Sequence, residues 1–330
     1  PGVLLLVEVY DPIAESYGDP LPHVLPILSN NEEVVFDIQK DFDLRHHLPP
    51  ESSLGLGGDY IIHCTDNWTK FRLRWAEQEG RPAVVTGLTQ DIERFAIYGG
   101  NAFLLQYTDF WMFWKTNRRF LTSRPSIRQV TPEQPEYLYW VGRLDGVIIN
   151  IKVTATQRSG TVTTYDRGDS TLDLGAIICI KAGFKQLNLP EIVDDPIVSY
   201  VVNLYSGGLN ISESITYNLT GTCGEFTRFY LFGNSLGGCD TVRATGKFVT
   251  NLEVATQQAS RIVTEEVINE GRGQDFDYNR RLRAIYEGSV GYKDYEYIVY
   301  LQDLLQSPEV WMIDINRQLY SPIQVDAGTV

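Results

Sequence analysis

The residues best suited to chemistry lie at positions 233–238, which read Gly-Asn-Ser-Leu-Gly-Gly. This order matches G-x-S-x-G, the pattern that places a nucleophilic serine on a sharp turn between a strand and a helix in serine hydrolases. The preceding residues 229–232, Phe-Tyr-Leu-Phe, have the composition of a strand. Ser235 is therefore the candidate nucleophile that the rest of the sequence must support or reject.

The residues after Ser235 do not fit a hydrolase. Positions 240–248 read Asp-Thr-Val-Arg-Ala-Thr-Gly-Lys-Phe, and this β-branched, glycine-containing run predicts a strand where a helix should support the oxyanion. The hydrolase order also requires a histidine after the serine. All histidines of this chain precede it: His23, His46, His47 and His63.

We therefore predict a hairpin at this position, with a strand, a glycine-rich turn and a second strand. Its glycines should supply positive φ angles, while the Asn and Ser side chains bond the local backbone. The structural turn comprises Gly233, Asn234, Ser235, Gly237 and Gly238. We expect no enzyme, and a serine hydrolase using Ser235 is the least favoured alternative.

Metal and cofactor sites are not predicted. His46 and His47 are adjacent, so on extended backbone their side chains point apart, and we expect both to be exposed in a polar loop. The aspartates that could bind calcium lack the spaced D-x-D-x-D-G pattern: Asp166, Asp169, Asp194 and Asp195. The carboxylate pair of a glycosidase depends on spatial approach, which leaves that class open.

The cysteines favour buried free thiols in a reducing compartment. They are Cys64, Cys179, Cys223 and Cys239, and no two of them have C-x-x-C spacing. A disulfide between Cys223 and Cys239 is the alternative.

An aromatic segment is the candidate contact surface: Tyr107, Phe110, Trp111, Phe113 and Trp114. In a strand these residues would project from both faces, so both faces need cover. One interpretation places the strand between its own sheet and a neighbouring domain. The other is a subunit interface or a platform for a host surface glycan, because aromatics give large contact areas.

Short strand-like runs dominate the chain, and Gly, Pro, Asn and Asp separate them. They lie at residues 60–64, 71–75, 147–154, 176–180 and 198–204. In the second run Phe71, Leu73 and Trp75 should share one face, with Arg72 and Arg74 on the other. The predicted fold is mainly β, with tandem β-sandwich (immunoglobulin- or fibronectin-like) domains and a smaller C-terminal α+β or β domain.

Three domains are expected, at residues 1–122, 123–250 and 251–330. Pro125, Pro132 and Pro135 indicate an extended linker at the first boundary. The last domain contains a helix near 294–306, capped by Asp294 and stopped by Ser307-Pro308. Residues 254–267 favour a strand. The sequence stops in mid-pattern, so we expect the native chain to continue beyond Val330.

Charge and composition argue against two classes of partner, nucleic acid and the membrane interior. The net charge of −14 and the dispersed Lys and Arg argue against binding nucleic acid, which requires a basic surface. No apolar segment reaches the roughly 20 residues of a membrane helix, so no membrane span is predicted. Residues 1–10 read as a strand, since they lack the basic start and cleavage site of a signal peptide.

Several phrases resemble β-rich structural proteins of tailed bacteriophages, prophages and phage-derived injection machines. They are residues 35–38 (Val-Phe-Asp-Ile), 71–80 with 96–100, 228–241 and 301–310. Cys239 departs from the pattern, where a larger residue is expected. The resemblance implies a non-enzymatic tail, baseplate or fibre-associated subunit without cofactors. It also implies a homo-oligomer that contacts other tail or virion subunits, in a virion or tail-like particle assembled in the host cytoplasm. A cell-surface adhesin or carbohydrate-binding protein is the alternative.

Overall fold

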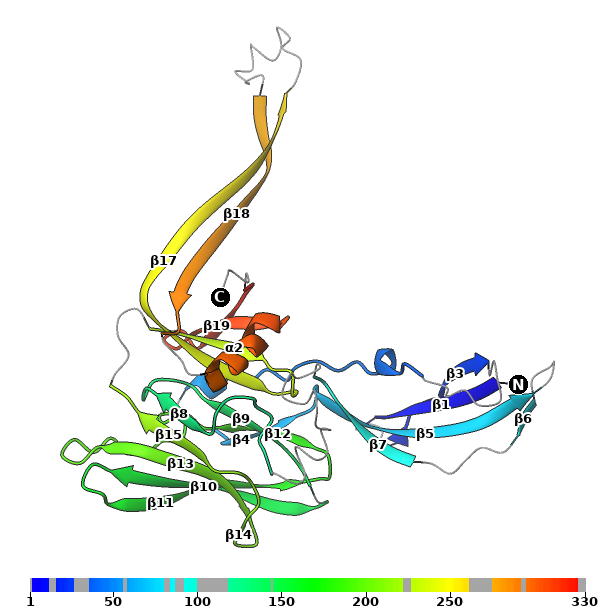
Figure 1. Cartoon of the computed structure of the whole chain (residues 1–330), viewed down its shortest axis with the longest axis horizontal. Coiled ribbons are helices and arrows are strands. Elements are labelled where there is room, and N and C mark those ends of the chain that lie inside the picture. Colours follow the sequence, from blue (N-terminus) through cyan, green and yellow to red (C-terminus); the bar gives the residue numbers. More distant parts are fainter. Residues whose placement is uncertain are drawn as a thin grey trace. The chain divides into compact units, whose positions relative to one another are not determined.

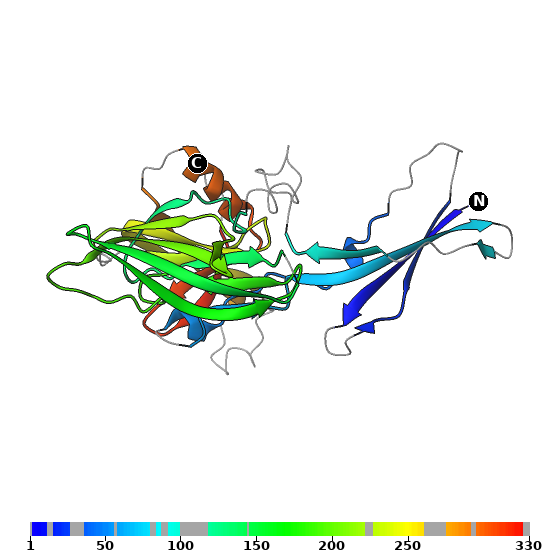
Figure 2. The ribbon, with the colours of Figure 1, turned by 90° about the horizontal axis from the view of Figure 1, so that it is seen from below.

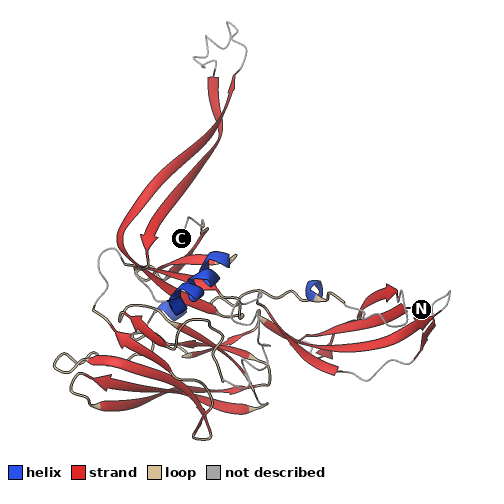
Figure 3. Cartoon of the chain, viewed as in Figure 1, coloured by secondary structure: helices blue, strands red, loops and turns tan. Residues whose placement is uncertain are grey.

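The computed structural model describes residues 2–11, 16–26, 36–55, 58–79, 84–86, 92–99, 118–143, 145–221, 227–260, 275–291 and 295–325. Strands dominate these residues (Figure 3). Most neighbouring strands run antiparallel, and β15 with β8 is a parallel pair. The prediction of a mainly β protein is confirmed, whereas the topology does not establish tandem immunoglobulin-like sandwiches.

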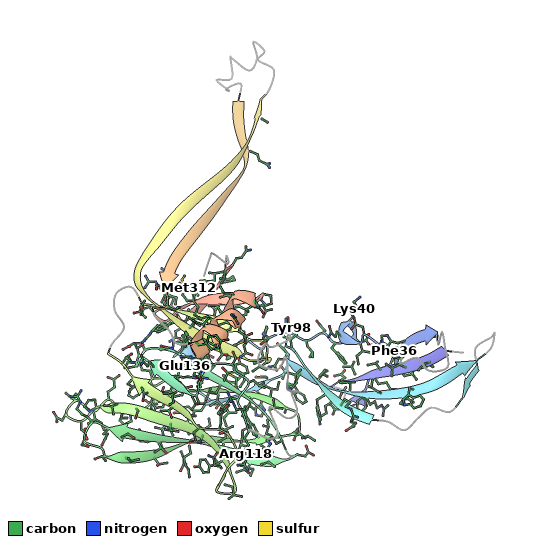
Figure 4. The ribbon with its side chains drawn as sticks, viewed as in Figure 1. Phe36, Lys40, Tyr98, Arg118, Glu136 and Met312 are labelled. Carbon is green, nitrogen blue, oxygen red and sulfur yellow. The ribbon has the colours of Figure 1, made fainter. Side chains whose placement is uncertain are left out.

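The N-terminal sheet places β1 (Gly2–Asp11) between β3 (Leu21–Pro26) and β5 (Trp68–Glu79). Its other strands are β2 (Ser16–Tyr17), β6 (Val84–Thr86) and β7 (Ile92–Ile97). Val7 and Phe71 are buried on one face, against Phe36 and its neighbours (Figure 4). Arg72 and Arg74 bind Glu8 on the opposite face, which confirms the predicted alternation for Phe71 and Leu73. Trp75, predicted on the same face as these two, is exposed and is not part of this core. A 3-10 helix, η1 (Gln39–Asp41), follows Ile38.

Two further sheets enclose a common core. The broader one, drawn in green in Figure 2, has the order β11-β10-β13-β15-β8, with β14 paired to β13. Its strands are β8 (Ile127–Val130), β10 (Val147–Gln157), β11 (Val162–Leu172), β13 (Ile197–Ser206), β14 (Leu209–Asn210) and β15 (Ile215–Leu219). The second sheet has the order β4-β12-β9: β4 (Ile61–Cys64), β12 (Ile177–Lys181) and β9 (Tyr137–Val141).

Strands β12 and β9 of the β4-β12-β9 sheet are buried on both faces. Every residue of β9 and β12 is buried, which explains why these strands are apolar throughout and do not alternate. Trp140 and Ile178 face the core shared with the broad sheet. Tyr139 and Cys179 face a second core, which also contains Leu231. This sheet is therefore the middle layer between two cores.

The last sheet has the order β18-β17-β16-β19-β20. Its strands are β16 (Arg228–Gly233), β17 (Cys239–Ser260), β18 (Asp275–Ser289), β19 (Val310–Asp314) and β20 (Leu319–Ile323). The helix predicted near 294–306 is confirmed as α2 (Tyr295–Gln306). Buried Tyr300 anchors it, because its hydroxyl donates to the Thr241 carbonyl at 3.1 Å. A second 3-10 helix is η2 (Glu51–Leu54). No helix of the described residues is long and apolar enough to cross a membrane.

The chain divides into two compact units, not into three consecutive domains. One comprises Pro1–Cys223, Phe229–Val242 and Lys293–Val330, and the other Gly224–Arg228 and Arg243–Tyr292. The expected boundary at 122/123 fails because β4 pairs with β12. The expected linker instead contains β8 and the buried side chains of Arg124 and Arg128. The boundary expected at 250/251 lies inside β17.

Candidate functional site

The glycine-rich segment forms the predicted hairpin turn between β16 and β17. The Asn234 amide donates to the Gly238 carbonyl at 2.8 Å, and the Gly237 amide donates to the Asn234 carbonyl at 3.2 Å. Strand β17 begins at Cys239, so the helix of a nucleophile elbow does not follow Ser235. The sequence prediction of strand, turn and strand is confirmed.

The buried side chain of Asn234 organises this turn. Its Oδ1 accepts from the amides of Leu236 and Gly238, both at 3.0 Å. Its Nδ2 donates to the Leu121 carbonyl and to Asp240 Oδ2, both at 2.8 Å. Since the side-chain amide offers two donors and two acceptor positions, all are used. The predicted bonding of Asn234 to the local backbone is confirmed.

The glycines of the turn serve two purposes. Only Gly237 has the predicted positive φ, at 93°. For Gly233 and Gly238 the expectation is wrong, and close approach explains them instead. A Cβ atom on Gly233 would lie 2.4 Å from the His46 ring. A Cβ atom on Gly238 would lie 2.9 Å from the Leu121 carbonyl oxygen.

The side chain of Ser235, unlike that of Asn234, does not hydrogen-bond to the turn. Its backbone amide faces Asp303 Oδ2 at 3.4 Å. Its Oγ is buried and has no hydrogen-bond partner within the described part of the chain. The expectation that this hydroxyl bonds the local backbone is therefore wrong. A buried hydroxyl without a partner is energetically unfavourable.

His46 is buried against the turn, and not exposed as expected. Its Nε2 lies 3.0 Å from the Asn234 carbonyl oxygen, and its Nδ1 lies 3.0 Å from Glu309 Oε2. Its ring meets Tyr98 edge to face, with 4.6 Å between centroids. Because a carbonyl only accepts, Nε2 must carry the hydrogen and donate it. It therefore has no free lone pair to take a proton from Ser235. The histidine thus acts as a structural link.

His47 is also mostly covered, and burial lowers its pKa. The prediction that His46 and His47 are exposed loop residues is therefore wrong for both. The physical reason is that the chain before Pro49 packs against the second core, which Leu48 contacts. There the His47 carbonyl accepts from the Tyr139 hydroxyl at 2.7 Å.

A cavity of about 200 Å³ opens beside the turn. It is lined by His46, Tyr98 and Ser235, and by Asp303 and Gln306 at the end of α2. Sequence reasoning singled out Ser235 and considered His46 only as a metal ligand, and it missed Tyr98, Asp303 and Gln306. They come from distant parts of the chain, and His46 lies 263 positions from its partner Glu309. No local pattern could have grouped them.

Buried charged residues contact the turn and its neighbours. Asp240 accepts from Thr122 Oγ1 at 2.8 Å as well as from Asn234, and burial raises its pKa. Arg124 donates to both oxygens of Glu136 at 2.8 Å and to the Thr241 carbonyl at 2.9 Å. The position and rotamer of Asn234 are thus set by a network that is not exposed to solvent.

Three cysteines are buried and free: Cys64, Cys179 and Cys239. Burial raises the pKa of Cys179 to about 12, so its thiol is not a ready nucleophile. The alternative disulfide does not form, because Cys239 is free. Cys223 lies outside the described residues. In the part of the chain that the structure describes, His, Cys, Asp and Glu do not form a group able to hold a metal.

The aromatic contact surface predicted from Tyr107, Phe110, Trp111, Phe113 and Trp114 lies outside the described residues. Its role as an interface or glycan platform stays a prediction. Comparison of the chain with protein-family models, curated proteins and solved structures finds no match.

Proposed function

We propose that this chain is a non-enzymatic assembly subunit of a phage tail or tail-like particle, which acts through contacts with other protein subunits. The phage class rests on the resemblance of the sequence phrases given above. The arrangement of its sheets as tandem immunoglobulin- or fibronectin-like β-sandwiches belongs to the same proposal. The assembly role rests on one structural observation, the hairpin of β17 and β18.

This hairpin is most of the second compact unit. After Arg228, the described residues of that unit are 243–260, which belong to β17, and 275–291, which contain β18. The strands pair from Thr245 with Ser289 to Ser260 with Asp275, and appear as a long twisted ribbon in Figure 1. At roughly 3.3 Å per residue, the 15 residues of β18 extend about 50 Å.

A ribbon of two strands buries little apolar surface by itself and is marginally stable in water. Each strand of such a ribbon also presents an edge that can pair with another chain. Both properties are expected of an arm that docks on a neighbouring subunit. They are unfavourable in a protein that works as a monomer.

The test removes the ribbon and measures assembly. Because Thr245 and Ser289 are paired, an Asn-Gly turn can join them in place of residues 246–288. We expect the full chain to form a defined oligomer in light scattering, and the shortened chain to be a folded monomer. Unchanged circular dichroism of the remaining sheets verifies folding.

A shorter deletion is the matched control. Joining Ser260 to Asp275 by the same turn keeps the paired strands, so assembly should persist. A full chain that stays monomeric over the whole accessible concentration range, or a shortened chain that assembles equally well, contradicts the assembly role. Genes for tail tube or baseplate proteins beside this one would support the phage class.

A further inference from the structure

The cavity beside the turn contains polar groups whose bonding capacity is unused. Ser235 Oγ is buried without a partner in the described part of the chain. Asp303 Oδ2 accepts from Ser123 Oγ at 3.2 Å and faces the Ser235 amide at 3.4 Å. These are long contacts for an ionised carboxylate, which normally accepts several short ones.

The electrostatics of the cavity are negative. Asp303 and Gln306 lie in the last turn of α2, where the helix dipole places partial negative charge. A carboxylate there opposes the dipole, and this last turn has no basic residue. Among the described residues that line the cavity, none is Lys or Arg.

Among the described residues that line the cavity, His46 is the only one whose side chain can become a cation, and it already faces a carboxylate. Its Nδ1 lies 3.0 Å from Glu309 Oε2. Asp303 is thus the uncompensated charge of the cavity. A ligand that fits must bring positive charge and hydrogen-bond donors.

We propose that this cavity binds an ammonium or guanidinium group. Asp303 supplies the charge, Ser235 Oγ accepts one N–H, and the Tyr98 ring lines the same cavity. A metal ion is a poorer fit, since the cavity offers a single free carboxylate. A neutral sugar is also poorer, because it leaves the charge of Asp303 next to the helix end uncompensated.

Two sources carry this chemistry, a basic side chain of another protein and a free small amine. The site does not depend on the proposed assembly role, because either source uses the same atoms. A basic side chain would deepen that role, as one contact between this subunit and its neighbour.

Saturation-transfer NMR with butylamine and methylguanidine, using the full chain, tests the proposal. Both should bind, and the neutral probes butanol and glucose should bind at least about tenfold more weakly. Asp303→Asn should weaken butylamine binding by about tenfold or more, and Ser235→Ala by about threefold. Asp194→Asn is the control for charge, since this exposed residue does not line the cavity.

Equal binding of butanol and butylamine, or tighter binding of glucose, overturns the proposal. Undiminished butylamine binding by Asp303→Asn overturns it as well. If Asp303→Asn fails to fold, Ser235→Ala and the comparison of charged with neutral probes decide.

A lysine amide acetylated at its α-amino group, with its side-chain ammonium left free, distinguishes the two sources. If it binds more tightly than butylamine, the ligand is a basic side chain of a protein partner, and if it binds equally, the ligand is a free amine. These results are independent of the oligomer measured by light scattering.

Discussion

Glu136 and Glu8 each face two arginines, but water reaches the two clusters differently. The side chains of Glu136, Arg124 and Arg128 are 1, 3 and 1% exposed. Glu8 is similarly covered at 4%, yet its arginines, at 29 and 25%, keep part of their surface in solvent. The whole Glu136 cluster is thus enclosed, whereas the Glu8 cluster is partly open to solvent through its arginines.

The difference shows how burial changes the role of the same chemistry. In the Glu136 cluster each charge has lost its water, so removing one partner leaves a charge that nothing solvates. Arg124 Nε and Arg128 Nη2 already have no hydrogen-bond partner among the described residues. In the Glu8 cluster solvent can replace a lost partner, so each contact contributes less.

Replacing the buried carboxylate should produce the largest effect. We expect Glu136→Gln to lower the free energy of unfolding by about 3–5 kcal/mol, because two buried guanidinium groups lose their charge partner. Urea unfolding followed by circular dichroism measures this. Glu191→Gln is the control, since Glu191 is exposed and should leave stability unchanged. A loss below that of Glu8→Gln would contradict the role assigned to burial.

The same substitution in the N-terminal sheet should have a smaller effect. We expect Glu8→Gln to lower the free energy of unfolding by about 1 kcal/mol, since Arg72 and Arg74 regain water when the carboxylate is lost. The measurement is the same urea titration. Added salt should shrink the difference from wild type, because mobile ions screen part-exposed charges. If salt has no influence, this cluster behaves as a buried one.

The smallest effect is a change with pH. Burial raises the pKa of Glu8, but hydrogen bonds and charge from Arg72 and Arg74 outweigh it and hold the pKa below its ordinary value of 4.5. A carboxylate with a lowered pKa stabilises the folded state above its unfolded-state pKa, and loses this contribution as the pH falls through the folded-state pKa.

The difference between wild type and Glu8→Gln should therefore be constant near neutral pH and decrease below about pH 4.5. Urea unfolding of both proteins from about pH 7 to about pH 3 measures it. A difference that grows as the pH falls would show that Arg72 and Arg74 do not control this carboxylate.

Local elements of the fold could be predicted from the sequence. The alternation of Phe71 and Leu73 with Arg72 and Arg74, the hairpin around Asn234 and the helix ending before Pro308 are all observed. Each depends on neighbours within a few residues, through side-chain period, turn chemistry or helix capping. The short strand-like runs, separated by turn residues, also predicted that the protein is mainly β.

Tertiary structure decided which strands are neighbours and where the site lies. Prolines suggested a linker after Thr122, but pairing of β8 with β15 and burial of Arg124 make that segment part of one compact unit. His46 has the local sequence of an exposed loop and becomes buried because Glu309 and Asn234 meet it from far along the chain. Side-chain period and turn propensity carry no information about such contacts, since these depend on how distant strands stack into layers.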